Sequence, residues 1–82
     1  MFELFYKSGG HFGPFMSYAE AEREALRRMN TQPSVYGGEI LIARYARKGE
    51  NTLRSPLGPY FEMARVFISR EVTQSVQTAI TA

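Results

Sequence analysis

Residues 17–30 constrain the fold most, because signals for the start and the end of a helix stand at the two ends of this segment. Ser17 and Glu20 have the spacing of a capping box, in which the serine hydroxyl accepts the Glu20 amide and the glutamate returns to the Ser17 amide. Asn30 and Pro33 predict where the helix stops. The apolar positions form one narrow stripe that can lie close to a sheet: Tyr18, Ala21, Ala25, Leu26 and Met29.

The segments on either side of this helix have the character of strands. Residues 2–7 alternate and are rich in aromatics, which predicts a first strand. A Gly-Gly turn follows, and residues 12–16 predict a short second strand in which Pro14 indicates an edge position or a bulge. Residues 39–47 predict a third strand, and the continuous apolar run at 40–43 is typical of a central strand that is buried on both faces.

The rest of the chain is less regular. Residues 48–59 have no periodicity and contain several glycines and prolines, which indicates a long exposed loop. Residues 60–70 fit a strand or an amphipathic helix, and we favour the strand because it would pair with the buried third strand. The prediction is a single α+β domain over residues 1–70, a small antiparallel sheet with one helix in the order ββαββ, or ββαβα if the last element is helical. Residues 71–82 then form a weakly structured tail.

The composition removes most catalytic and metal-binding chemistry. The sequence has no cysteine, no aspartate and a single histidine, His11. Disulfides, thiolate zinc sites and a cysteine nucleophile are therefore excluded, and one histidine cannot build a histidine-rich metal site. A Ser–His pair could be drawn from Ser8 or Ser17, but the third member of the triad would have to be a glutamate. We therefore expect no enzymatic activity, no catalytic residue, no metal and no cofactor.

The chain is also short for a self-sufficient core. A domain of 82 residues buries only roughly 60–65% of the surface that its unfolded chain exposes. Without disulfides or metals, partner binding or self-association, for example as a homodimer, is the remaining source of stability. No apolar run is long enough for a membrane span, and the N-terminus does not resemble a signal peptide. Together with the absence of cysteine, these features lead us to expect a cytoplasmic protein.

Binding is the function class that the composition favours. The chain has 11 aromatic residues, six Phe and five Tyr, more than one thin helix can cover on a sheet. Eight of its ten basic residues are arginines, which suit interfaces, although a GC-rich genome would also raise their number. A net charge of +2 argues against a DNA mimic and against a purely electrostatic nucleic-acid binder.

We predict two partner-binding surfaces. The first is an aromatic face of the sheet with an arginine rim, to which the last strand adds an aromatic: Phe5, Tyr45, Arg44, Arg47 and Arg65. The second is a basic row on the outer face of the helix: Arg23 and Arg27, with Arg28 nearby. An alternative for the helix row is that its arginines pair internally, for example Arg28 with Glu24.

In size, layout and lack of catalytic groups, the chain resembles the small proteins that bacteriophages encode to block host machinery, anti-CRISPR proteins in particular. The resemblance covers the whole chain loosely and carries no residues across. It implies a stoichiometric inhibitor that acts in the bacterial cytosol, binds a CRISPR–Cas effector subunit and obstructs DNA recognition. The lack of net acidity departs from the members that imitate DNA and favours a steric block, or contact with the guide RNA or its acidic surroundings. The alternative function is a small RNA- or DNA-binding regulator that uses the arginines and aromatics of the sheet.

Overall fold

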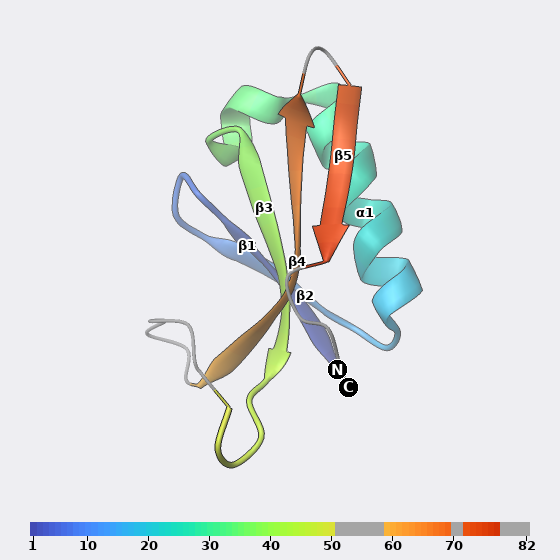
Figure 1. The fold of residues 1–82 in the computed structure, drawn as a ribbon. Helices are drawn as coiled ribbons and strands as arrows, with labels where there is room; N and C mark the ends of the chain where they lie inside the picture. The colour runs from blue at the N-terminus through green and yellow to red at the C-terminus, as the bar shows by residue number, and fades with distance from the viewer. Residues whose placement is uncertain (51–58, 70–71, 78–82) are drawn as a thin grey trace.

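The computed structural model describes residues 1–50, 59–69 and 72–77 of the chain. Five strands form one antiparallel sheet in the order β2-β1-β3-β4-β5, and the helix α1 packs against one side of it (Figure 1). The elements follow in the order β1 (Phe2–Tyr6), β2 (His11–Phe15), α1 (Tyr18–Thr31), the 3-10 helix η1 (Pro33–Tyr36), β3 (Glu39–Tyr45), β4 (Tyr60–Ser69) and β5 (Val72–Gln77). The predicted α+β class and the order ββαββ are confirmed for the elements from β1 to β4.

The segment beyond β4 corrects one expectation. Sequence reasoning predicted a weakly structured tail at residues 71–82, yet Val72–Gln77 form β5. This strand pairs with β4 in a register without a shift, from Ser69 opposite Val72 to Ala64 opposite Gln77. The segment has few hydrophobic residues of its own, so its pattern did not reveal a strand that depends on pairing with a neighbour. Most of the predicted loop at 48–59 lies outside the described residues.

The helix begins as its sequence predicts, with one change in the cap. The Ser17 hydroxyl accepts the Glu20 amide at 3.2 Å, which satisfies one of the free amides of the first turn. The Glu20 carboxylate, however, accepts the amide of Met16 at 3.3 Å and not that of Ser17. At the other end, α1 extends one residue beyond the predicted cap, Asn30, to Thr31.

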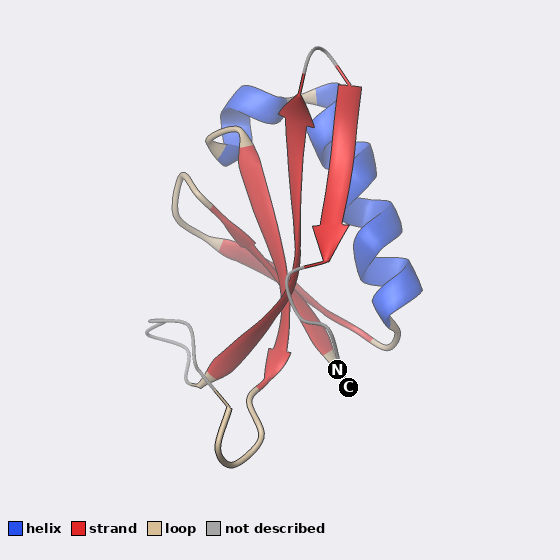
Figure 2. Cartoon of the chain, in the orientation of Figure 1, coloured by secondary structure: helices blue, strands red, loops and turns tan. Residues whose placement is uncertain are grey.

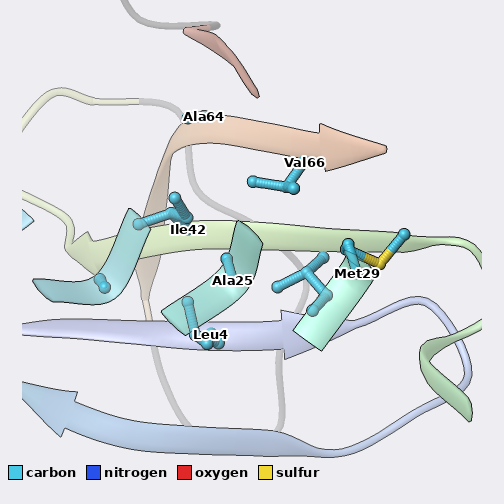
Figure 3. Packing of buried hydrophobic residues seen from close by; sticks show 8 residues of the cluster. Leu4, Ala25, Met29, Ile42, Ala64 and Val66 are labelled. Carbon is cyan, nitrogen blue, oxygen red and sulfur yellow. The ribbon is translucent and has the colours of Figure 1, made fainter. Parts of the chain in front are cut away.

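The main core lies between α1 and the sheet (Figures 2 and 3). Small residues of the helix face aliphatic side chains of the three central strands, so the helix backbone can approach the sheet closely. Each large aliphatic side chain that is fully buried contributes about 1.5–3 kcal/mol of transfer free energy. The buried cluster consists of Leu4, Ala21, Ala25, Met29, Ile40, Ile42, Ala64 and Val66.

A bulge in β4 changes which side chains share a face of the sheet. The pairing of β3 with β4 shifts between Ile42 and Ala43, and Met63 of β4 is left without an opposite residue. Side chains alternate along a strand, so one extra residue moves everything before it to the other side. Tyr60, which would otherwise point toward α1, therefore lies on the side away from the helix, where its ring packs against Phe5.

A second bulge lies in β2, an edge strand, so both outcomes predicted from Pro14 are confirmed. Gly13 and Pro14 together stand opposite the single residue Glu3. Gly13 has φ +147°, where residues with side chains are strained. A Cβ atom at this position would lie 2.8 Å from the Glu3 carboxylate and 3.1 Å from the backbone carbonyl oxygen of Phe2. The conformation therefore favours glycine, and an added Cβ atom would also be crowded by the Phe2 carbonyl and the Glu3 side chain.

We expect Gly13→Ala to lower the free energy of unfolding by about 2–4 kcal/mol, because it adds a steric overlap to the backbone strain. Gly38→Ala is the matched control, since Gly38 has φ +82° but nothing within 4 Å of the added Cβ atom. The control should lose only about 1–2 kcal/mol, the cost of the conformation alone. Urea unfolding of both variants measures the difference, and equal losses would contradict the proposed contact.

Candidate partner-binding face

The side of the sheet opposite α1, here called the open face, has a small buried cluster of its own. Ten hydrophobic residues are buried in the described part of the chain, and two of them, Ala43 and Tyr60, stand outside the helix-side cluster. The Tyr60 ring meets Phe5 edge-on at 4.8 Å and stacks with Tyr45 at 4.7 Å between ring centres. Tyr60 is 5% exposed and Tyr45 is 60% exposed, so Tyr45 is the outer layer of this cluster.

Apolar side chains extend this cluster across the neighbouring strands. Leu41 of β3 stands opposite Phe5 of β1, and both are half-buried. On the neighbouring strand β2, His11 also stands opposite Phe5, with 6.2 Å between the ring centres. Phe67 of β4 is also half-buried. The open face therefore carries aromatic and aliphatic side chains on β1, β3 and β4.

The arginine on this face is compensated by carboxylates. The Arg65 side chain donates to Glu62 at 2.9 Å and lies 3.9 Å from the Glu39 carboxylate. The hydrogen bond and the charge of Glu62, with a smaller effect of Glu39, raise the pKa of Arg65. Arg65 is exposed, as predicted, but two acidic neighbours already share its charge.

A carboxylate and an imidazole meet at the β1–β2 side of the open face. The Oε2 atom of Glu3 is buried and accepts no hydrogen bond from a described residue, and Nδ1 of His11 lies 3.6 Å from it. This is the histidine–glutamate pair that a serine triad would need, but neither candidate serine joins it. The Ser8 hydroxyl donates to a backbone carbonyl at 2.9 Å, and Ser17 caps α1.

The environment of Tyr60 disfavours its charged form. Burial, then the neighbouring Tyr45 hydroxyl, then the negative charge of Glu3, together raise the pKa of Tyr60 from 10.0 to about 12. The phenol therefore stays neutral in the folded chain over a pH range in which an ordinary tyrosine ionises.

This shift predicts a pH dependence of stability. Between pH 10 and about 12, the unfolded chain releases the Tyr60 proton while the folded chain keeps it, so the free energy of unfolding falls as the pH rises. Tyr60→Phe removes this proton, so the free energy of unfolding should fall less steeply with pH over that range. Urea unfolding of both proteins at pH 9, 10, 11 and 12 measures it, and equal slopes would contradict the burial of Tyr60.

Arg44 does not lie on the open face, which corrects the sequence prediction. It stands opposite Phe2 and Phe61, and Phe2 packs against the helix-side core. Its guanidinium lies 4.8 Å from the ring centre of Phe61 and donates to both carboxylate oxygens of Glu50 at 2.9 and 2.7 Å. Arg44 is only 11% exposed, and its hydrogen bonds are the main reason that the pKa of Glu50 falls to about 2.

Arg47 lies beyond the end of β3 and is exposed. Its backbone amide donates to the same Glu50 carboxylate that holds Arg44. The carboxylate therefore fixes the turn that follows β3, and the structure does not bring Arg47 together with the open-face cluster.

The arginines of the predicted helix row differ in their contacts. Arg23 is exposed and contacts no partner among the described residues, whereas Arg27 donates to Glu24 at 3.1 Å. Hydrogen bonds from Arg27 and then from Arg28 lower the pKa of Glu24 to about 2, against the opposing effect of burial. The predicted pairing of Glu24 with Arg28 is confirmed at 2.8 Å.

Arg28 joins the helix to the β1–β2 hairpin. Its guanidinium lies 4.0 Å from the ring centre of Phe12 and 5.9 Å from those of Tyr6 and Tyr36, and it donates to the Tyr6 hydroxyl. A cation enclosed by rings and hydrogen bonds in this way contributes to packing. Its position makes Arg28 part of the fold, and it is not available as a contact surface.

The structure therefore places three of the predicted residues, Phe5, Tyr45 and Arg65, on the same face of the sheet. Comparison of the chain with protein-family models, with curated proteins and with solved structures found no match. Within the described residues, no helix is both long enough and apolar enough to cross a membrane. The open-face residues that sequence reasoning did not name are Glu3, Glu39, Leu41, Ala43, Tyr60, Glu62 and Phe67.

Proposed function

We propose that the chain is a non-enzymatic protein-binding module and that the open face is its binding surface. The cluster of Phe5, Tyr45 and Tyr60, continued by half-buried Leu41 and Phe67, carries this proposal. Tyrosine and arginine are among the residues enriched in interface hot spots, and this face carries both. In the described part of the chain, α1 packs only on the other side of the sheet (Figure 2).

The charges on this face support a protein partner over a nucleic acid. A sheet that stacks bases needs free cations beside its aromatics, to hold phosphates. Here Arg65 is shared by Glu62 and Glu39, and Glu3 adds a third carboxylate. Arg44, the other arginine expected to hold phosphates, is bound to Glu50 on the helix side. Phosphates approaching this face would meet carboxylates.

The resemblance to phage-encoded inhibitors makes the proposal more specific. We propose a stoichiometric inhibitor, from a phage or mobile element, that blocks a host defence complex such as CRISPR–Cas. A surface that binds through apolar contacts acts by occupying its target, so one molecule would block one site. An aromatic face with partly compensated charge fits such a steric block better than imitation of DNA, which requires many unpaired acids.

This proposal predicts that the outermost aromatic of the face is needed for binding. Tyr45→Ser removes it, and Val35→Ser is the matched control because Val35, on η1, is 57% exposed while Tyr45 is 60% exposed. Immobilised wild type and Val35→Ser should retain the same protein from bacterial lysate at a stoichiometric ratio. We expect Tyr45→Ser to retain at least about tenfold less, the loss of a typical hot spot.

Thermal unfolding of both variants confirms that they remain folded before capture is compared. Equal capture by Tyr45→Ser and wild type would contradict the role of the open face. Capture of no stoichiometric protein by the wild type, together with binding of RNA or DNA that weakens steeply with salt, would favour the alternative function.

A further inference from the structure

The two edges of the sheet differ in how far they can accept another strand. The β2 edge carries the Gly13–Pro14 bulge, which breaks its register with β1. Proline has no amide hydrogen, and a bulge interrupts the row of backbone groups that an incoming strand would use. Natural sheets protect their edges in this way against pairing with other molecules. The β2 edge is therefore a poor site for strand addition.

The β5 edge has none of these protections. Its six residues, Val72–Gln77, include no proline, no glycine and no charged residue. Their register with β4 shows no shift, and β5 is the last strand of the described sheet. One row of its backbone groups thus lacks a partner strand among the described residues. Such an edge is a template for pairing with another chain.

We propose that the β5 edge pairs antiparallel with β5 of a second copy of this chain. A twofold axis perpendicular to the sheet pairs one residue with itself, and an axis at Gln74 places Gln74 opposite Gln74 of the second copy, with residues 72–76 of the two strands overlapping. No charged residue lies in the strand, and two copies therefore meet without like-charge repulsion. The added burial compensates for a short chain without cysteine.

The symmetry of this pairing also explains why it would stop at two copies. A twofold interface uses the same edge of both molecules and is closed. The joined sheet then ends at two β2 edges, both of which carry the protective bulge. Because the axis is perpendicular to the sheet, the two open faces lie on the same side. The proposal therefore does not depend on what the open face binds.

Charge exchange at the centre of the strand tests the proposal. Gln74→Lys and Gln74→Glu each place two like charges beside the axis, and each should raise the dimer dissociation constant about fivefold in sedimentation equilibrium. An equimolar mixture of the two variants should recover the wild-type constant or a lower one, because opposite charges then meet. Val35→Lys adds the same charge on η1 and should leave the constant unchanged.

Recovery on mixing separates a pairing defect from a folding defect, which mixing would not repair. A wild type that is monomeric at all concentrations overturns the proposal, as does a weakened dimer that mixing does not restore. The Tyr45→Ser variant should dimerise like the wild type. Loss of dimerisation and loss of partner capture are therefore independent outcomes, and either proposal can fail alone.

Discussion

One helix has to cover a sheet that has two sides. The helix α1 spans Tyr18–Thr31, and its buried residues Ala21, Ala25 and Met29 fill one side only. The other side must be covered by its own large side chains or by another molecule, because a sheet with exposed apolar residues on both faces is unfavourable in water. Phe5, Tyr45 and Tyr60 provide a partial cover. The exposed Tyr45 ring marks where this cover ends and where a partner would continue it.

The bulge at Met63 determines the composition of the open face. If all residues of β4 alternated without a bulge, Tyr60 would lie on the same side as Ala64, which is buried under the helix. With it, Tyr60 crosses to the side of Phe5, where burial raises its pKa to about 12. The bulge therefore places the Tyr60 ring under the open face and not under the helix, and bulges commonly redirect side chains at functional sites.

Several of these features could be predicted from the sequence because their causes are local. The Ser17 cap and the Pro14 edge strand follow from neighbouring residues. The strand at 60–69 follows instead from the need of the buried third strand for a partner, because its own pattern also fits a helix. Arg44 was misplaced because its charge suggested an exposed face, although alternation from Ile40 and Ile42 already puts it on the helix side, where Glu50 compensates it.

The rest of the structure depends on contacts between distant segments. The bulge at Met63 has no glycine or proline to mark it, and β5 pairs with an edge that only the folded β4 provides. The acidic neighbours of Arg65 also follow from the register between strands: Glu39 is far from it in sequence and close to it across the sheet. Patterns within a single segment carry none of this information.

Site-specific photo-crosslinking in bacterial cells tests whether the open face binds a protein partner. A photoreactive benzoylphenylalanine is placed either at Tyr45 on the open face or at Val35 on η1, two positions of similar exposure. We predict one dominant covalent adduct of defined mass with the label at Tyr45, and none with the label at Val35. No adduct at Tyr45, or the same adduct from both positions, would contradict the assignment of the open face as the binding surface.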